Sequence, residues 1–350
     1  MIFNIYNNEP SQLPQGKADF LLAGSVTRTC EIEGITQAGI PTMIPLTPTL
    51  DAEFITNEKV FSLGELAETP TGVPSPAIIT RAVENLVGFS TIEVLDLGLE
   101  KTPQNTTYAS FGISPSESIT KGANIDVELL FNKGLDAGHR YELKGNYLIL
   151  GESTPSGTTT ATTTALACGY DVRDDFSSSF KDVPNDIRDE TINKALSLID
   201  DSMSLNEKLS LVSDNMLIFC AGFIISAHKR FEVVLGGGTQ MASCLLLIDK
   251  LKDDYFMSID EKNITLATTS WVANDKNSDI KNLLSKLSFT PNAIYSHLSF
   301  ENAEIPVLKK YDEGEAKEGV GAGASLAYGY SNGLSNSQIV EQIEYILYTL

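Results

Sequence analysis

Glu152 stands in a loop whose composition could bind a phosphorylated molecule and place a carboxylate beside it. An apolar strand, expected at residues 147–150, runs into small hydroxylated residues, and an Ala/Thr-rich helix follows directly in the segment 150–171, LGESTPSGTTTATTTALACGYD. This layout directs backbone N–H groups and a helix N-terminus toward any anion in the loop. An anion site with a carboxylate inside it indicates a phosphorylated substrate and proton transfer.

The loop differs from the commonest triphosphate-binding motif. That motif needs two glycines with four residues between them, followed by a lysine that neutralises the outer phosphates. Here Gly151 and Gly157 have one residue too many between them, and Thr158 stands where the lysine should be. We therefore expect a single monoester phosphate rather than a nucleoside triphosphate. An ordinary strand-to-helix turn capped by Ser and Thr explains the same pattern equally well.

A second glycine-rich segment, residues 313–330 (EGEAKEGVGAGASLAYGY), contains Glu318. Gly319, Gly321 and Gly323 allow a ligand to approach the backbone closely, or the chain to adopt unusual dihedral angles. The GxGxG pattern does not indicate dinucleotide binding, because no convincing strand–turn–helix unit encloses it. A surface loop before the C-terminal helix is the competing interpretation, and composition alone favours it slightly.

The elements that must position these segments alternate between apolar strands and helices. Strands are expected at 18–23, 91–97, 147–150, 232–235, 263–269 and 293–298, and helices at 185–203, 240–251, 278–287 and 337–350. Residues 98–146 show only short β-like pieces and turn residues. Strands separated by helices of ten or more residues form right-handed crossovers, so we expect an α/β fold with a mainly parallel sheet and flanking helices. Ligands bind at the carboxyl ends of such strands, where loops 151–160 and 236–239 would meet.

Composition and charge narrow the class of protein. The chain has 350 residues, 42% of them hydrophobic and 20% charged, and we expect a single α/β domain over residues 1–350 with at most a small subdomain formed by the termini. The net charge of −21 disfavours nucleic acid and anionic membranes as partners, since both require clustered Lys and Arg. No apolar run is long enough to cross a bilayer, and the first ten residues do not resemble a secretion signal, so we expect a cytoplasmic protein.

Neither cysteines nor histidines indicate a metal site. The four cysteines are far apart, show no metal-ligand spacing and resemble small buried residues of a protein in a reducing compartment (Cys30, Cys168, Cys220 and Cys244). The three histidines are also distant from one another, so only the fold could assemble a site from them (His139, His228 and His297). We expect neither a metal nor a cofactor.

Three segments occur in an order that is typical of a known family. They are Gly151-Glu152 with Gly157-Thr158-Thr159 before an Ala-rich helix, EVVLGGGTQMA at 232–242, and KEGVGA at 317–322. The segment 23–53, with GSVTRTCEIEGITQAG and TPTLDAE, adds to the pattern. The chain resembles the nicotinate-nucleotide–dimethylbenzimidazole phosphoribosyltransferases of cobalamin lower-ligand synthesis, and more closely their archaeal relatives. It departs from the family pattern at Lys317, Val320, 153–156 and 212–215.

The resemblance implies a Rossmann-like three-layer fold and a reaction. The enzyme would transfer a phosphoribosyl group from nicotinate mononucleotide to a benzimidazole-type base, without a metal, as a homodimer. Glu318 would be the general base, and Glu152 would orient the ribose or share the proton transfer. The resemblance assigns the remaining roles to Gly157, Thr158 and Thr159 at the 5′-phosphate, Gly237, Gly238 and Thr239 at the donor site, and Gly319 and Gly321 in the acceptor loop.

Two other functions remain open at the level of the sequence. A non-catalytic nucleotide-binding or regulatory protein would keep the same fold and phosphate loop. A phosphatase or other phosphoryl-transfer enzyme would use the Thr-rich loop, although no metal cluster or Cys nucleophile motif accompanies it. The acceptor base is also open, since dimethylbenzimidazole, a hydroxylated benzimidazole and adenine all offer an azole nitrogen.

Overall fold

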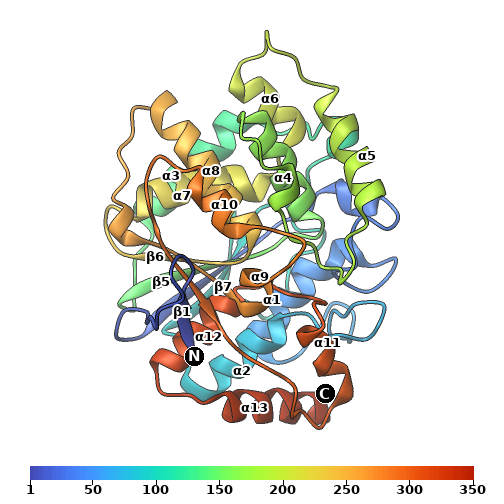
Figure 1. Ribbon diagram of the computed structural model, residues 1–350, viewed down its shortest axis with the longest axis vertical. Coiled ribbons are helices and arrows are strands. Elements are labelled where there is room, and N and C mark those ends of the chain that lie inside the picture. The colour runs from blue at the N-terminus through green and yellow to red at the C-terminus, as the bar shows by residue number, and fades with distance from the viewer.

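The computed structural model of this chain describes residues 1–350, apart from the side chain of residue 254, and it is built around one eight-stranded sheet (Figure 1). The strand order is β1-β8-β7-β6-β5-β2-β3-β4, with β1 antiparallel to β8 and every other pair parallel. The strands are β1 (Ile2–Asn4), β2 (Ala18–Gly24), β3 (Thr91–Asp96), β4 (Tyr108–Ser110), β5 (Tyr147–Ser153), β6 (Val233–Gly236), β7 (Ile264–Thr269) and β8 (Asn292–Ser296).

The central strands are continuous apolar runs because helices cover both faces of the sheet. Every residue of β2, β5, β6 and β7 is buried. Side chains alternate between the two faces: Leu21 belongs to the core on one side, whereas Phe20 and Leu22 belong to the core on the other. This confirms the expected α/β fold with a mainly parallel sheet, and the expected strands lie within one to three residues of the observed ones.

Two helical layers enclose the sheet (Figure 1). One layer contains α3 (Val127–Arg140), α4 (Gly157–Ala167), α5 (Asn185–Leu196), α6 (Leu205–Val212), α7 (Asn215–Ala227), α8 (Thr239–Asp254) and α10 (Ile280–Ser285). The other contains α1 (Thr47–Asn57), α2 (Ala77–Val87), α11 (Lys309–Asp312), α12 (Ala322–Ser331) and α13 (Asn336–Thr349). The short helix α9 (Ser270–Ala273) follows β7.

Three sequence expectations were wrong. The region 98–146 holds the fourteen-residue helix α3 and only one short strand, β4. The helix expected at 185–203 ends at Leu196, because the chain turns at Ser197 instead of continuing. The glycine-rich segment 313–330 is no surface loop in its second half, since α12 begins at Ala322 and eight of its ten residues are buried.

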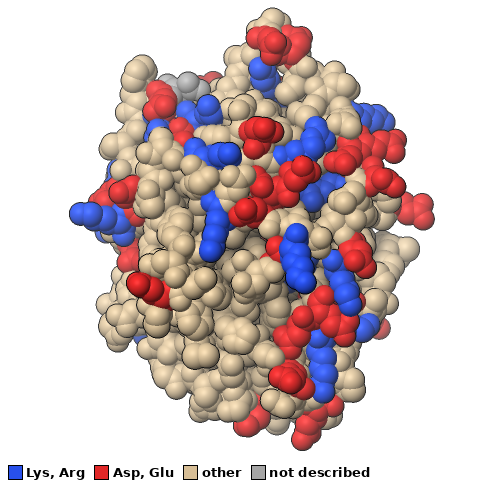
Figure 2. Space-filling model, viewed as in Figure 1, with Lys and Arg blue, Asp and Glu red and all other residues tan. Residues whose placement is uncertain are grey.

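The terminal elements join the same layers, because β1 pairs with β8 and α13 packs against α2. Among the described residues, no helix has the length and apolar character needed to cross a membrane. On the face shown in Figure 2, Lys and Arg side chains lie among Asp and Glu side chains and do not form a continuous basic surface.

Candidate active site

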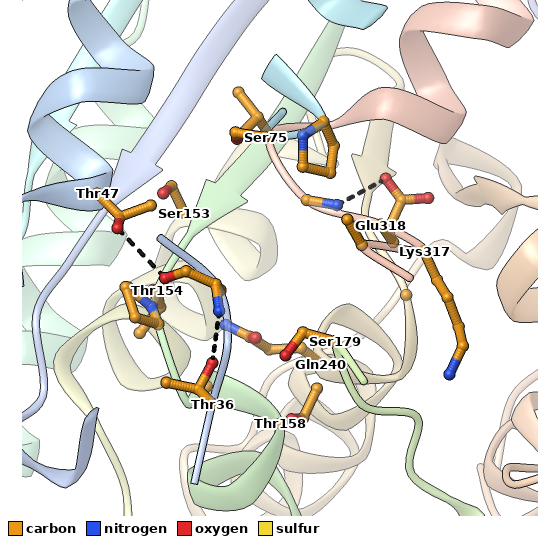
Figure 3. A pocket seen from close by; sticks show the side chains of 18 of the residues that line it. Thr36, Thr47, Ser75, Ser153, Thr154, Thr158, Ser179, Gln240, Lys317 and Glu318 are labelled. Carbon is orange, nitrogen blue, oxygen red and sulfur yellow. Dashed lines mark hydrogen bonds between the residues drawn. The ribbon is translucent and has the colours of Figure 1, made fainter. Parts of the chain in front are cut away.

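A cavity lies at the carboxyl ends of the parallel strands, where the loops after β5, β6 and β7 meet the segment 316–320. It encloses about 890 Å³, counting the part that is open to solvent. Its walls combine the loop after β5, the start of α8, a serine segment at 177–179 and N-terminal residues between 36 and 76. The sheet therefore brings together segments that are far apart in the sequence (Figure 3).

The loop between β5 and α4 has the properties of an anion site. It turns sharply, with Gly157 N donating to the Thr154 carbonyl at 2.9 Å and Ser156 in the left-handed conformation at φ 62°. The hydroxyls of Thr154 and Ser156 are shielded from solvent and lack a hydrogen-bond partner in the described part of the chain. Buried hydroxyls normally have partners, so these two are suited to a ligand. In the first turn of α4, the N–H groups of Gly157, Thr159 and Thr160 donate to the carbonyls of Thr154 and Ser156, so among the described residues the N–H of Thr158 is the one left for a ligand.

Glu152, near the end of β5, is 6% exposed and lines this cavity. Its Oε2 accepts one hydrogen bond, from Nε2 of Gln240 at 3.2 Å, and its carbonyl accepts from Val320 N at 2.8 Å. Burial raises the pKa of Glu152 to about 8, and the nearby carboxylates of Glu318, Asp214 and Asp51 contribute to this rise. Glu152 therefore carries a proton at neutral pH.

Glu318 lies across the cavity from Ser153 (Figure 3). Its Oε2 accepts from Thr269 N at 2.8 Å and from the Thr268 hydroxyl at 3.1 Å. Its Oε1 accepts from Gly319 N at 3.2 Å and Gly323 N at 3.1 Å. Burial raises the pKa of Glu318 to about 7, although these four hydrogen bonds oppose the shift by favouring the charged form. The result is a carboxylate fixed in position that exchanges its proton near neutral pH.

Glycines in the GGGTQMA segment (236–242) and in the segment 317–323 allow the two to pack closely. The segment 317–323, which contains Glu318 and is called the base-bearing segment below, therefore lies directly on the sheet. A Cβ added at Gly236 would lie 2.9 Å from the Gly321 Cα, and one at Gly323 would lie 2.1 Å from the backbone of Thr268. Val320, which stands where the family pattern has Thr, has a φ of 53°, a conformation that β-branched residues rarely adopt. The Thr80 hydroxyl donates to its carbonyl at 2.7 Å.

The cavity includes most of the residues singled out from the sequence. It is lined by Glu152, Glu318, Gly157, Thr158, Gly238, Thr239 and Gly319. The other three stand behind this lining: Thr159 is buried in α4, Gly237 contacts Met241, and Gly321 packs against Phe20. Thr239 also accepts a hydrogen bond from Ser177 N at 3.1 Å and so ties the start of α8 to the serine segment.

Sequence reasoning missed Asp51 and Gln240. Asp51 lies in α1, is 2% exposed and accepts hydrogen bonds at 2.7 Å from the hydroxyls of Ser75 and Ser153. Burial raises its pKa to about 6. Gln240, the residue after the glycine–threonine run, links Glu152 to the phosphate-loop side of the cavity. Gln240 could have been found in GGGTQMA, and Asp51 lies in the TPTLDAE segment of the family pattern, which assigned it no role.

The departure at Lys317 has a structural explanation. Its Nζ forms an ion pair with Asp275 at 2.9 Å, and both side chains are 4% exposed. The same ammonium donates to the carbonyls of Ser178 at 3.2 Å and Phe180 at 3.0 Å, while the Ser177 hydroxyl donates to Asp275 at 2.8 Å. Lys317 thus fastens the serine segment over the cavity, and its charge is already neutralised.

Among the described residues, no group of three or more His, Cys, Asp or Glu side chains is arranged to hold a metal ion. The carboxyls of raised pKa that line the cavity are Glu152, Glu318 and Asp51, and the loop after β5 adds hydroxyls that could bind an anion. Such a set can bind a phosphate monoester and accept a proton from a ring nitrogen.

Archaeal proteins match this chain over almost its whole length. A UPF0284 protein of Sulfurisphaera tokodaii is 32% identical over 99% of this chain and 97% of its own length. A UPF0284 protein of Sulfolobus acidocaldarius is 35% identical over 95% of this chain and 94% of its own length. The chain belongs to the UPF0284 family. No family model matches the sequence.

Two crystal structures from Thermus thermophilus share the fold of this UPF0284 chain. One is a nicotinate-nucleotide–dimethylbenzimidazole phosphoribosyltransferase, with a TM-score of 0.61 and 14% identity over 94% of this chain and 83% of that protein. The other is CobT, with a TM-score of 0.61 and 14% identity over 96% of this chain and 85% of that protein. The resemblance stated from the sequence is thereby confirmed for the fold.

Proposed function

We propose that this UPF0284 protein transfers a 5-phosphoribosyl group from nicotinate mononucleotide to a benzimidazole-type base, giving an α-ribotide and nicotinate for the lower ligand of a cobamide. The observation that carries the proposal is the pairing, in one cavity, of two proton-exchanging carboxyls, Glu152 and Glu318, with a loop suited to a phosphate. The fold shared with a phosphoribosyltransferase from Thermus thermophilus supports it.

The 5′-phosphate would lie in the loop after β5. Rotation about the Cα–Cβ bonds of Thr154 and Ser156 would turn their unpartnered hydroxyls toward the phosphate oxygens. The Thr158 side chain and the N-terminus of α4 complete the site. Because Lys317 is neutralised by Asp275, binding relies on dipoles and hydroxyls instead of a free cation.

The reaction needs one base and no acid. The bond between C1′ of the ribose and the pyridinium nitrogen breaks, and its electron pair neutralises the nicotinate ring. The acceptor azole forms the new C1′–N bond through one nitrogen and loses the proton of its other nitrogen. Holding donor and acceptor in line for displacement supplies much of the rate enhancement.

Glu318 is the residue suited to take that proton. A general base works best when its pKa lies near the working pH, and the pKa of Glu318 is about 7. To receive the proton, Glu318 must give up one of its four hydrogen bonds, and the Thr268 hydroxyl can rotate away from Oε2 because it is the one donor of the four that is not a backbone N–H. The carboxyl therefore gains the proton without losing its position.

Glu152 plays a different part because its pKa of about 8 keeps it protonated when Glu318 is ionised. A protonated Glu152 can donate to a ribose oxygen and leaves only one negative charge on the carboxyl pair. Gln240 fixes its orientation. The two acids thus divide the work through their surroundings, as pairs of active-site carboxyls commonly do.

The test is incubation with nicotinate mononucleotide and a panel of azole bases, followed by mass spectrometry of the products. Wild type, Glu318→Gln and Glu341→Gln would be compared, since Glu341 is exposed on α13 and serves as the matched control. We expect nicotinate release and a new α-ribotide with wild type and the control. The Glu318→Gln variant should lose about 10²- to 10⁴-fold in kcat, the range that general base catalysis supplies.

Binding of the mononucleotide without turnover on any base would contradict the proposal and favour a nucleotide-binding protein. The side chain of Glu318 lines the cavity and accepts four hydrogen bonds. This arrangement supports an enzyme over a non-catalytic nucleotide-binding protein. The homodimer, the cytoplasmic location and the single domain over residues 1–350 stay predictions. Light scattering of the purified protein tests the first of these.

A further inference from the structure

Asp51 is the one buried carboxylate of the cavity that the proposed reaction does not use. It has about four lone-pair positions and accepts only two hydrogen bonds, from Ser75 and Ser153. No Lys, Arg or His of the described chain forms an ion pair with it. A carboxylate that is 2% exposed and lacks a cation is costly unless a further donor reaches it.

Polar side chains from the N-terminal part of the chain line the cavity, and Ser75 among them donates to Asp51. The others are Thr36, Thr47, Glu68 and Thr69. Among the described residues, no aromatic ring lines the cavity, and the apolar lining is limited to small side chains such as Ala38, Pro76 and Val320. A purely apolar base would leave the remaining acceptor positions of Asp51 without a donor.

Most hydroxyls of this wall already donate within their own loops. Thr47 donates to the Ala38 carbonyl at 3.3 Å, and the hydroxyls of Thr69 and Thr71 share a hydrogen bond at 2.9 Å. Ser75 donates to Asp51 itself. The acceptor positions left over on Asp51 are therefore a polar feature of the cavity that no hydrogen bond of the described residues satisfies.

Asp51 lies at the acceptor end because its wall adjoins the base-bearing segment. Pro76, next to Ser75, approaches to within 3.7 Å of the position that a Cβ at Gly319 would take. A flat base with its ring nitrogen against Glu318 would therefore direct its far edge toward Ser75 and Asp51. Asp51 also contacts the end of β5 through Ser153, and the phosphate loop continues from there toward Gly157 and Gln240.

We propose that Asp51 determines acceptor specificity: it selects an azole base that carries a hydrogen-bond donor, a hydroxyl or amino group, on its six-membered ring. This inference rests on the proposed transferase activity and deepens it. A dimethylated ring presents no donor to Asp51 and buries the carboxylate without compensation.

The experiment compares bases that differ in the donor alone. The values of kcat/KM are measured for 5-hydroxybenzimidazole, 5-methoxybenzimidazole, 5,6-dimethylbenzimidazole and adenine, with nicotinate mononucleotide saturating. The methoxy compound keeps the oxygen and loses the donor. We expect wild type to favour the hydroxy over the methoxy base by about 10- to 100-fold, which is the range for a hydrogen bond to a charged group. Adenine tests the amino donor.

Two variants locate the effect at Asp51. Asp51→Asn and Asp51→Ala should bring the hydroxy/methoxy ratio close to one, mainly through KM of the hydroxy base, and should leave KM for nicotinate mononucleotide unchanged. The Glu341→Gln control should keep the wild-type ratio. Thermal unfolding tests whether each variant is folded. If one of the two Asp51 variants does not fold, the other is used alone.

The outcomes separate this inference from the proposed function. Turnover with equal preference for the two bases, or a rise in KM for the mononucleotide in the Asp51 variants, overturns the role of Asp51 and leaves the transferase intact. If no base turns over, the transferase proposal fails. Calorimetric binding of the four bases to wild type and Asp51→Asn then decides separately whether Asp51 recognises a donor.

Discussion

The side-chain amide of Gln240 contacts two parts of the site at once: it donates to Glu152 at 3.2 Å and fills the space above Gly157. A Cβ at position 157 would lie 2.3 Å from Oε1 of Gln240. The first residue of α4 is thus glycine because the start of α8 occupies the place of its side chain. The loop after β5 and the carboxyl of Glu152 are joined through one side chain.

Gly157→Ala is therefore expected to displace Gln240 and break its hydrogen bond to Glu152. The free energy of unfolding should fall by about 1 kcal/mol, as for a typical lost hydrogen bond. In a Gln240→Ala background the same change should be neutral or stabilising by up to about 1 kcal/mol, because alanine favours a helix over glycine. Urea unfolding of wild type, the two single variants and the double variant measures both effects. If the two changes in the free energy of unfolding simply add, the contact between position 157 and Gln240 is contradicted.

The three buried carboxyls should make the protein less stable as the pH rises. The pKa values of Asp51, Glu318 and Glu152 are raised to about 6, 7 and 8, mainly by burial. A group with a raised folded-state pKa binds its proton more tightly in the folded chain, so the free energy of unfolding decreases between its unfolded pKa, near 4, and its folded pKa. We expect the decrease between about pH 4 and pH 8.

Glu152→Gln should remove part of this decrease. Urea unfolding at pH 5.5 and pH 8 gives the change in the free energy of unfolding with pH for wild type and for Glu152→Gln. The same measurement on Glu341→Gln, which replaces an exposed glutamate, is the control. The contribution of Glu152 should be a few kcal/mol at most, since one pKa unit corresponds to about 1.4 kcal/mol. Equal slopes in all three proteins would show that Glu152 is not the source.

The rate of the proposed transfer should fall below about pH 7. Glu318 accepts a proton only when ionised, and its pKa is about 7, so kcat should drop tenfold for each pH unit on the acid side. Glu318→Asp should lower kcat and keep the acid limb, whereas Glu318→Gln should remove it. A pH-independent kcat in wild type would exclude Glu318 as the base of the rate-limiting step.

Lys317→Met should be strongly destabilising because it leaves Asp275 buried without its cation. Removal of one partner of a buried ion pair typically costs about 3–5 kcal/mol. The double variant Lys317→Met/Asp275→Asn should recover part of this loss. The exposed ion pair of Lys181 with Glu313 provides the control, since Lys181→Met should change the free energy of unfolding by much less than Lys317→Met does. Urea unfolding decides, and equal losses for Lys317→Met and Lys181→Met would contradict the argument.

Apolar runs predicted the sheet because parallel strands that are buried on both faces consist mainly of continuous apolar residues. β5 and β7 are continuous apolar or Thr-containing stretches that end at polar loops, and both were found. Helix α3 was missed in a region that showed only short β-like pieces and turn residues, and it contains two glycines, Gly134 and Gly138. In the structure a Cβ at either position would lie 2.1–2.4 Å from backbone atoms of α7, so these glycines permit close packing of two helices. A single sequence does not distinguish that use of glycine from a turn.

The candidate site was predictable where its residues fall in compact motifs, as Glu152, Glu318 and Gly238 do. Asp51 was not, because its environment comes from Ser75 and Ser153, which meet it only through folding. Lys317 was visible as a departure, but its partner Asp275 lies 42 residues earlier in the sequence. Interactions between distant loops depend on the three-dimensional arrangement, which the spacing of residues does not encode.

The fastening of the serine segment by Lys317 has a consequence for the timing of catalysis. Lys317 and Glu318 are neighbours in the chain, so the lysine that holds Ser178 at the cavity and the residue assigned as the base share one peptide unit. Release of the serine segment would require the Lys317 ammonium to give up Ser178, Phe180 and Asp275, next to Glu318. In the proposed reaction, a movement of this segment would therefore affect the exchange of nicotinate for the next substrate more directly than bond formation.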